Sequence, residues 1–464
     1  MIDHYSISND ATKLKYRWKK LDFLSLDGNE ISSRCSHTST LVKHNLYIIG
    51  GGLKHNDHFQ HYGDVWRLDL LSQSYECVVE HGFTPRRGHT ACLCNDRIYI
   101  FGGIIGEYII SAERGALTNQ LLVFDTRDNS FIEIKHQNDI WPSPRRGHTA
   151  TVYNNSMFIY GGDCDFQSDV MRLYVFNIDQ SCFTWIFQSG TIPQGLMLSC
   201  YDRIDQHLII YGGSTSQFIS NKLLTLNLCT GEWRDNVAYL RNSWGKEQRD
   251  PSKRFAAAAT ITMNDQFFIL FGGSGQDEYF NDISLIRTLP LTTICHEHDF
   301  INGRPQCVSS QVPEARNGHS FTAISSTSAV MAFGGVYPTI YFNDIWLFEL
   351  LVLPDVPSQV EDITSNNILS YFSTLLDDDR FVDIRLLFDS GDHHMCHRIV
   401  LCSRSNYFRK LLDGWSCENI ANTNLNIPTV RIKELKYEVF QWIKVYLYKG
   451  ILPIEATDSA ENIW

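Results

Sequence analysis

The chain has 464 residues with a formal net charge of −12, and 43% of the residues are hydrophobic while 20% are charged. This length exceeds one ordinary core, so we expect a large repeat domain or two to three domains. The acidic balance, without a basic stripe, argues against nucleic acid as the main ligand.

The N-terminus has no apolar signal region, and no run approaches the roughly 18 apolar residues of a membrane helix. The 13 cysteines are odd in number and scattered, which favours buried thiols in a reducing compartment. We therefore expect a cytoplasmic protein, with nuclear and endomembrane-associated locations as alternatives, and no membrane span.

One pattern repeats six times along the chain: a continuous apolar run that ends in two glycines. Successive copies start 52, 59, 51, 60 and 62 residues apart. The pairs, which we interpret as structural, are Gly50 and Gly51, Gly102 and Gly103, Gly161 and Gly162, Gly212 and Gly213, Gly272 and Gly273, and Gly334 and Gly335. Continuous apolar runs indicate strands buried on both faces, and a glycine pair suits a tight exit where side chains do not fit.

The residues that flank each copy follow a consistent order. A turn with Arg and usually His precedes the run, as in "RRGH" at 86–89 and again at 145–148. The fourth copy lacks both residues, and the fifth keeps Arg254 but replaces His with Ala. Because these residues recur at equivalent places, we interpret them as serving the turn rather than catalysis. After the glycines come a polar loop, a strand opening with Asn or Asp, and a fourth strand with an aromatic residue. The fourth-strand aromatics are Tyr75, Phe131, Trp185 and Trp233.

Six four-stranded units that cannot bury their faces alone predict a six-bladed, all-β propeller over residues 14–352, preceded by a tail at 1–13. The sixth unit shows no fourth strand, and "YRWKKLDF" around Trp18 supplies one. We expect this N-terminal strand to close blade six. An insertion at 292–314 is interpreted as a long surface loop.

The double glycines, the Arg-x-Gly-His turn, the Asn-Asp strand and the spaced aromatics resemble kelch repeats. This resemblance implies a β-propeller whose protein partners dock on the rim formed by the turns and the loops after the glycines.

The pattern changes in the last hundred residues. A polar, Pro-containing linker (353–366) precedes helical spacing, a strand "VDIRLLF", the stretch "HRIVLCSRSNYFRKLL", a strand "TVRIKEL" and a helix "FQWIKVYLYKG". This order resembles an α/β BTB/POZ domain over 367–464. The residues that carry the resemblance are Asp383, His397, Leu401, Ser403, Ser405, Phe408, Tyr446, Tyr448 and Gly450. Further helices are usual in that family, so we expect a domain truncated at its C-terminus.

Kelch repeats placed before a BTB domain resemble the leucine-zipper-like transcription regulator family and, more loosely, fungal kelch regulators of Ras signalling. The resemblance implies a non-enzymatic adaptor that brings a Ras-type GTPase, or its regulator, to a cullin-RING ubiquitin ligase, with a BTB homodimer as a further possibility. A signalling or polarity scaffold in a Ras pathway without ligase contact is the alternative. A propeller enzyme is a more distant alternative.

Partner-binding residues are predicted in two places. Arg87 and Arg146, the second arginines of their turns, are not needed by the repeat, and His58 and Tyr108 lie in loops after glycine pairs. Together they form the predicted partner-binding rim. In the BTB segment, Tyr407, Phe408 and Glu418 form the predicted interface. Glu418 fits the hydrophobic-x-Glu element of cullin-binding BTB domains, although Ser416 occupies its apolar position.

Two loops have residue types that bind zinc: His55, His58 and His61, and the stretch "CHEH" at 295–298. No second paired motif would fix a tetrahedral site, so we interpret both as solvent-exposed loops. The chain also shows no nucleophile elbow, P-loop or paired-carboxylate motif. We therefore predict no metal, no cofactor and no catalytic residue.

Overall fold

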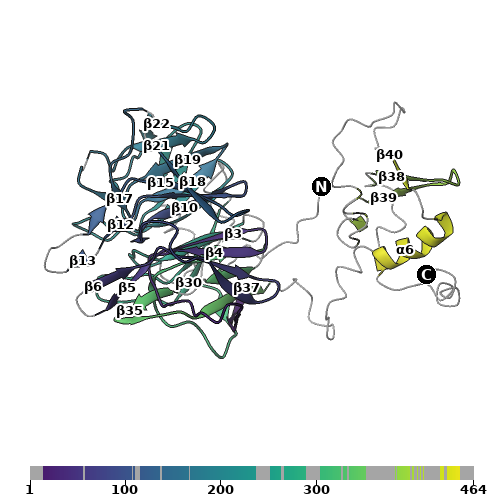
Figure 1. Ribbon diagram of the computed structural model, residues 1–464, viewed down its shortest axis with the longest axis horizontal. Coiled ribbons are helices and arrows are strands. Elements are labelled where there is room, and N and C mark those ends of the chain that lie inside the picture. Colours follow the sequence, from purple (N-terminus) through teal and green to yellow (C-terminus); the bar gives the residue numbers. More distant parts are fainter. Residues whose placement is uncertain are drawn as a thin grey trace. The chain divides into compact units, whose positions relative to one another are not determined.

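The computed structural model divides into two compact units, Met1–Asp355 and Val356–Trp464 (Figure 1). The described residues are 14–55, 58–106, 108–109, 115–135, 138–166, 168–236, 251–262, 266–288, 304–325, 328–331, 334–351, 382, 384–397, 400–401, 405, 408, 411, 429–432 and 436–449. The tail 1–13 and the linker 353–366 lie outside these ranges, so the predicted domain boundaries stay predictions.

Six of the sheets in the first unit hold its main strands, and we call them blades one to six. Blade one holds β2 (Leu24–Ser25), β3 (Thr38–Val42), β4 (Asn45–Ile49), β7 (Val65–Asp69) and β8 (Ser74–Val79). Blade two holds β10 (Thr90–Cys94), β11 (Arg97–Phe101), β15 (Leu121–Asp125) and β16 (Ser130–Ile134). Blade three holds β18 (Thr149–Tyr153), β19 (Ser156–Tyr160), β21 (Leu173–Asn177) and β22 (Cys182–Ile186).

Blade four holds β23 (Ser189–Gly190), β24 (Cys200–Ile204), β25 (His207–Tyr211), β26 (Leu223–Asn227) and β27 (Glu232–Asp235). Blade five holds β28 (Ala258–Thr262), β29 (Phe267–Phe271) and β30 (Ile283–Arg287). Blade six holds β1 (Lys15–Leu21), β31 (Gln306–Cys307), β33 (Thr322–Ala323), β34 (Ser328–Met331) and β37 (Ile345–Leu351).

Short strands outside the blades form the loops at one end of the unit, on the left in Figure 1. They are β5 (Gly52–His55), β6 (His58–His61), β9 (Arg86–Arg87), β12 (Ile104–Ile105), β13 (Tyr108–Ile109), β14 (Ala116–Leu117), β17 (Arg145–Arg146), β20 (Asp163–Cys164), β32 (Asn317–His319), β35 (Gly334–Tyr337) and β36 (Ile340–Tyr341). These strands pair with one another, including β6 with β13 and β9 with β12.

The six blades form a closed ring. Their innermost strands contact one another in the cyclic order β3, β10, β18, β24, β28, β33 and back to β3. A ring of backbone hydrogen bonds of 2.7–2.8 Å closes in the same order, in which each N–H donates to the carbonyl of the preceding blade. Its members, all with positive φ, are Ser36, Gly88, Gly147, Leu198, Ala256 and Gly318. The predicted six-bladed propeller is confirmed, and it closes through these contacts rather than through one continuous sheet.

The glycine pairs form a second ring. The second glycine of each pair donates its N–H to a turn carbonyl of the next blade, as Gly51 does to Arg86 and Gly335 does to Arg34, both at 2.9 Å. All twelve glycines have positive φ. A Cβ on Gly102 would lie 2.6 Å from the Arg145 carbonyl oxygen. The glycines are therefore required by close blade-to-blade approach as well as by the tight exit.

Blade six is assembled from distant parts of the chain. The N-terminal strand β1 pairs antiparallel with β37, with Trp18 opposite Phe348, and Trp18 also packs on Phe271 of blade five at 5.0 Å. On its other side β1 pairs in parallel with β31. The interpretation of 292–314 as a surface loop is therefore wrong for Gln306–Cys307, because those residues add a fifth strand to blade six.

The aromatic residues of the outer strands pack between neighbouring blades. In blade three this residue is Phe183, which is fully buried and lies 6.0 Å from Phe101 of blade two. The sequence-based choice of Trp185 is wrong by two positions, because Trp185 is 52% exposed. A two-residue shift keeps the same face of a strand, so alternation alone could not separate the two residues.

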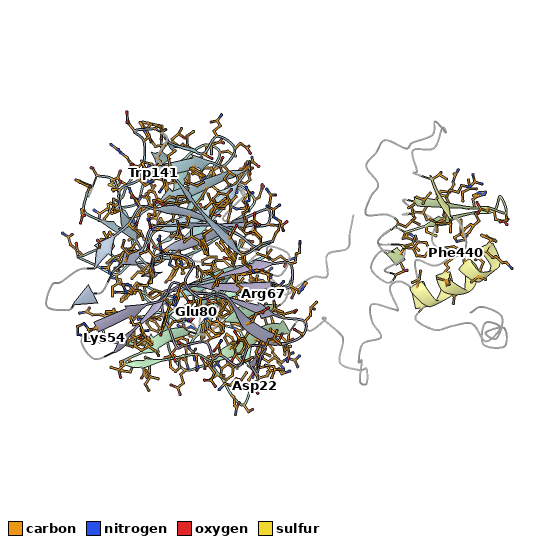
Figure 2. All side chains as sticks on the ribbon, viewed as in Figure 1. Asp22, Lys54, Arg67, Glu80, Trp141 and Phe440 are labelled. Carbon is orange, nitrogen blue, oxygen red and sulfur yellow. The ribbon has the colours of Figure 1, made fainter. Side chains whose placement is uncertain are left out.

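The second unit has a three-stranded sheet, in which β38 (Ile384–Phe388) lies between β39 (His393–Cys396) and β40 (Thr429–Ile432). Helix α6 (Tyr437–Lys449) packs on it through Phe440, whose ring lies 5.0 Å from Phe388 (Figure 2). Phe408 is 1% exposed in this core, so its side chain stabilises the unit and offers no contact surface, contrary to the interface prediction. Among the described residues, no helix is long and apolar enough to cross a membrane.

Candidate partner-binding site

The repeated arginines belong to the interior of the ring. Arg34, Arg86, Arg145, Arg254 and Arg316 are all fully buried. Arg34 shows the arrangement: its guanidinium donates to both carboxylate oxygens of Asp64 at 2.7 and 2.9 Å and to the Gly50 carbonyl at 2.9 Å. Its guanidinium also lies 4.2 Å from the Tyr62 ring centre. These contacts tie the turn to the glycine pair and to the start of the third strand, and none leaves the guanidinium available to a ligand.

The repeated histidines join neighbouring blades. The Nε2 atom of His89 lies 3.1 Å from the Thr38 hydroxyl, and that of His148 lies 2.7 Å from the Thr90 hydroxyl. Burial, followed by the Arg86 charge, lowers the pKa of His89 to about 3. The rings are therefore neutral at ordinary pH, as a structural hydrogen-bonding role requires.

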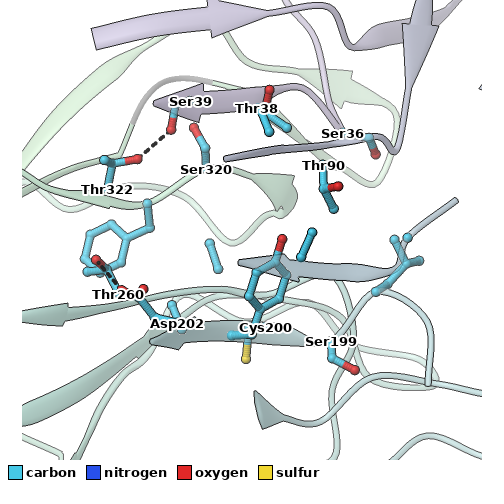
Figure 3. A pocket seen from close by; sticks show the side chains of 18 of the residues that line it. Ser36, Thr38, Ser39, Thr90, Ser199, Cys200, Asp202, Thr260, Ser320 and Thr322 are labelled. Carbon is cyan, nitrogen blue, oxygen red and sulfur yellow. Dashed lines mark hydrogen bonds between the residues drawn. The ribbon is translucent and has the colours of Figure 1, made fainter. Parts of the chain in front are cut away.

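An open pocket of about 440 Å³ lies at the centre of the ring (Figure 3). Hydroxyl groups and small side chains dominate its wall, and the Ser39 and Thr322 hydroxyls bond across blades one and six at 2.6 Å. The described wall has one carboxylate, Asp202, which accepts hydrogen bonds from the Ile261 N–H at 2.6 Å and the Thr260 hydroxyl at 3.2 Å. Burial raises the pKa of Asp202. Asp202 therefore links blades four and five, and it has no second carboxylate with which to share acid–base work.

The rim of the ring carries the loops that differ most between repeats. The strands β5, β6, β12, β13, β17 and β35 lie at this end (Figure 1), and β14, β20 and β36 pair with β12, β17 and β35. Lys54 of β5 projects outward here (Figure 2). Variable loops on a rigid ring are the usual setting for recognition of a partner.

Arg87 is the centre of one group on the rim. Its guanidinium lies 4.1 Å from the Phe59 ring centre, and its Nε donates to His61 Nε2 at 3.2 Å. Burial, followed by the Arg87 charge, lowers the pKa of His61 to about 4, so the ring stays neutral and accepts this bond. Half-buried and held on two sides, Arg87 presents a fixed cation to whatever approaches.

Three tyrosines extend this group. Tyr279 and Tyr337 meet edge to face at 5.1 Å, and Tyr337 is 39% exposed. Tyr341 interacts electrostatically with both Arg87 and Tyr279. We call Phe59, Arg87, Tyr279, Tyr337 and Tyr341 the rim cluster. Tyr and Arg are the residue types enriched at interface hot spots. Sequence reasoning missed the tyrosines, although each follows a glycine pair in the same way as Tyr108.

The other predicted rim residues are placed as follows. Arg146 pairs with Asp163 at 3.0 Å, and its side chain is 34% exposed. His58 is exposed on β6. The backbone of Tyr108 pairs with that of Phe59, whereas its side chain lies outside the described residues. In the second unit, Tyr407 and Glu418 also lie outside the described residues.

The structure describes most of one of the two loops considered as metal sites, whereas the other lies outside the described residues. His61 is committed to Arg87, while His58 is exposed. Within the described part of the chain, no group of three His, Cys, Asp or Glu side chains has a metal-binding arrangement. Residues 295–298 and the His55 side chain fall outside that part.

Comparison with known families agrees with this architecture. A model described as the KLHDC2/KLHL20/DRC7 Kelch-repeats domain matches residues 2–213 and 88–283, and the BTB/POZ domain matches 372–463. Kelch and BTB domains are typically protein-interaction domains, so their combination supports a protein-interaction adaptor.

Several characterised proteins are similar to the chain. The leucine-zipper-like transcriptional regulator 1 homolog of Drosophila melanogaster is 24% identical over 397 residues, which cover 82% of this chain and 36% of the relative. Kelch domain-containing protein 3 of Rattus norvegicus is 26% identical over 197 residues, covering 41% and 50%. Tip elongation aberrant protein 1 of Schizosaccharomyces pombe is 26% identical over 209 residues, covering 43% and 17%. The chain thus spans half or less of these relatives, and the predicted resemblance is confirmed. With the Kelch-repeats model matching more than half of its residues, the chain belongs to the kelch-repeat family, and a BTB domain follows the repeats.

Proposed function

We propose that the chain is a non-enzymatic adaptor whose rim cluster holds a protein partner while the BTB domain connects it to a second protein. The observation that supports this proposal is the rim cluster itself: an arginine fixed between Phe59 and His61 that interacts electrostatically with Tyr341, which in turn interacts with the Tyr279–Tyr337 pair, at the end of the ring where the loops vary. Such anchors supply binding energy at low entropic cost because the ring already holds them in place.

The partners follow from the family rather than from the rim. We propose a Ras-type GTPase, or its regulator, at the rim, and a cullin-RING ligase or a second BTB domain at the BTB domain. Holding a substrate beside a ligase raises its effective concentration, and a dimer adds avidity. A cytoplasmic location fits this role.

The test compares proteins that co-purify with four forms of the chain from cells. These are the complete chain, a deletion of residues 366–464, the rim variant Arg87→Ala with Tyr337→Ala, and the control Leu71→Ala. Leu71 is 77% exposed in the β7–β8 turn, which is the end of the third strand away from the rim.

We expect the complete chain and the control to recover both a cullin and a Ras-type GTPase. The deletion should lose only the cullin, and the rim variant should lose only the GTPase. If no cullin is recovered with any form while the GTPase is retained, the chain is a Ras-pathway scaffold without ligase contact. If the rim variant retains every partner, the rim assignment is wrong.

A further inference from the structure

Three blades carry a fifth strand on their outer edge. β2 pairs in parallel with β8 of blade one, β23 with β27 of blade four, and β31 with β1 of blade six. Each added strand comes from the connection that enters its own blade. The outer edge of a blade is therefore a surface on which this fold accepts a short parallel strand.

The added strands use one hydrogen-bond pattern. In blade one, the Leu24 and Leu26 N–H groups donate to the carbonyls of Gln73 and Tyr75, both at 2.9 Å. In blade four, Ser189 and Thr191 donate in the same way to Gly231 and Trp233, both at 3.1 Å. In both cases the second acceptor is the packed aromatic residue of the outer strand. Two main-chain donors spaced two residues apart thus define what the edge binds.

In blade three, the described residues add no strand to the same edge. Among the described residues, β22 pairs only with β21. The carbonyl of its packed aromatic, Phe183, points outward and accepts a hydrogen bond from the Asn138 side-chain amide at 2.7 Å, so a side chain occupies the acceptor that the added strand uses in blade four. Because backbone groups alternate along a strand, those of Trp185 point outward as well. In blade one the corresponding N–H, of Cys77, is covered by the Asp27 carboxylate at 3.2 Å.

The side chains of this edge differ from those of every other outer strand that the structure describes. At the position of Trp185, two residues after the packed aromatic, the other outer strands have Lys20, Cys77, Glu133 and Asp235. Trp185 is 52% exposed and Phe187 is 80% exposed. No charged residue occurs between Asp179 and Asp202. Charges on an edge strand normally prevent pairing with another chain, and β22 lacks them.

Blade two provides the contrast. Its outer strand β16 also has no added strand among the described residues, but it holds Glu133, which pairs with Lys135 at 2.5 Å beside the strand. Pairing a foreign strand there would desolvate that ion pair. In the described part of the chain, neither blade has an added strand, but only in blade three is that edge combined with an uncharged, aromatic surface.

We propose that the outer edge of β22, with Trp185 and Phe187, is a docking site for a short extended segment of a partner protein. The segment is uncharged and pairs with β22 through its main chain, in the way that β23 pairs with β27, and one of its N–H groups takes the place of the Asn138 amide at the Phe183 carbonyl. Its side chains pack on the two exposed aromatic residues. This site lies on the outer wall of the propeller and is separate from the rim cluster, so it does not depend on the proposed function.

The test uses the full-length chain and a fluorescent peptide with the sequence of residues 187–193, FQSGTIP, which contains β23. We expect saturable binding by anisotropy and slower amide hydrogen exchange in the segment 182–187. Trp185→Lys and Phe187→Ser should each weaken binding about tenfold or more, as loss of a hot-spot aromatic does. The matched control Ile132→Lys, on the open edge of blade two, should leave the affinity within about twofold.

A second peptide, N-methylated at the residues that correspond to Ser189 and Thr191, cannot donate the two hydrogen bonds, and we expect no binding. Absence of saturable binding at about 1 mM peptide would overturn the proposal. Equal binding of the N-methylated peptide, or unchanged affinity of both aromatic variants, would also overturn it. Protection of 182–187 that rises with protein concentration in the absence of peptide would assign the edge to a second copy of this chain instead.

Discussion

Blades three and four show how much a repeat can change without breaking the ring. Blade three keeps the buried Arg145, which donates to the Asp169 carboxylate at 2.6 Å. In blade four, Leu196 replaces the arginine and Lys222 stands at the usual carboxylate position, beside Leu223 at the start of β26. Both blades nevertheless make the same backbone bonds: Gly147 donates to Gly88, and Leu198 donates to Gly147.

The difference teaches that the side-chain pair is replaceable, both partners in blade four and the carboxylate alone in blade two, where Arg86 donates to Gln120 at 2.7 Å, whereas all six blades keep the backbone ring. Removing one partner of a buried ion pair leaves an uncompensated charge, but replacing both with packed apolar or solvated groups is often neutral. Blade four follows this rule, since Leu196 is buried and Lys222 reaches Asp235 at 3.0 Å instead.

The largest expected effect comes from breaking the Arg145–Asp169 ion pair in blade three. Arg145→Ala should lower the free energy of unfolding by about 3–5 kcal/mol, because Asp169 would lose its buried cation and keep only the exposed Arg172, at 3.8 Å. Denaturant unfolding measures this change. Arg146→Ala, at the half-exposed neighbouring position, is the control and should cost less than about 1 kcal/mol. A loss for Arg145→Ala no larger than the control's would contradict the comparison.

The packed aromatic residue offers the next comparison. Phe183→Ala should cost about 3–5 kcal/mol, since the ring is fully buried between blades two and three. Trp233→Ala should cost a similar amount in blade four, where Trp233 lies 4.7 Å from Tyr160. Trp185→Ala should change stability by less than about 0.5 kcal/mol. The same unfolding measurement decides which of the two aromatic residues packs between the blades. A loss of stability at Trp185 as large as that at Phe183 would favour the sequence-based prediction of Trp185.

Lowering the pH should destabilise the protein through His148 of blade three, whereas Ser199, at the matching position of blade four, should have no such effect. Burial, followed by the Arg145 charge, lowers the pKa of His148 well below its usual value, whereas blade four has Ser199 there. A depressed folded pKa gives stability that is complete above the unfolded pKa of about 6.5 and decreases as the pH falls below it.

Each such histidine should therefore remove up to about 1.4 kcal/mol per pH unit below pH 6.5. For His89 this loss continues toward its folded pKa of about 3. The pH dependence of unfolding in His148→Ser should be shallower than that of the unmodified chain between pH 6 and about 4.5. Identical slopes would show that His148 does not titrate differently on folding.

The smallest expected effect comes from restoring a hydrogen bond that is missing between blades five and six. His319 lacks the hydroxyl that its counterparts use, because Ala258 occupies the place of Thr38 and Thr90, and its Nε2 has no hydrogen-bond partner among the described residues. Ala258→Ser should raise the free energy of unfolding by about 0.5–1.5 kcal/mol. Ala259→Ser, one residue along the same strand, is the control. No gain over the control would mean that the pairing does not contribute.

The amino-acid sequence by itself determined the number of blades, the glycine pairs, the closing strand around Trp18 and the order of the BTB strands. These features are predictable from local sequence patterns: a repeated interval, a continuous apolar run or a helical period. The structural role of the repeated arginines was also predictable, because a residue that recurs at the same place in five of the six repeats serves the repeat rather than one ligand.

Only the tertiary structure decided the rest. It placed β31 beside β1 and chose Phe183 over Trp185. It also brought Tyr341 into electrostatic interaction with Arg87, more than 250 residues earlier in the chain, and paired Tyr279 with Tyr337. None of these outcomes has a local pattern, because each depends on which blade lies next to which and on which strand edge remains uncovered. Closure of the ring fixes those neighbours, and with them both the rim cluster and the open edge of β22.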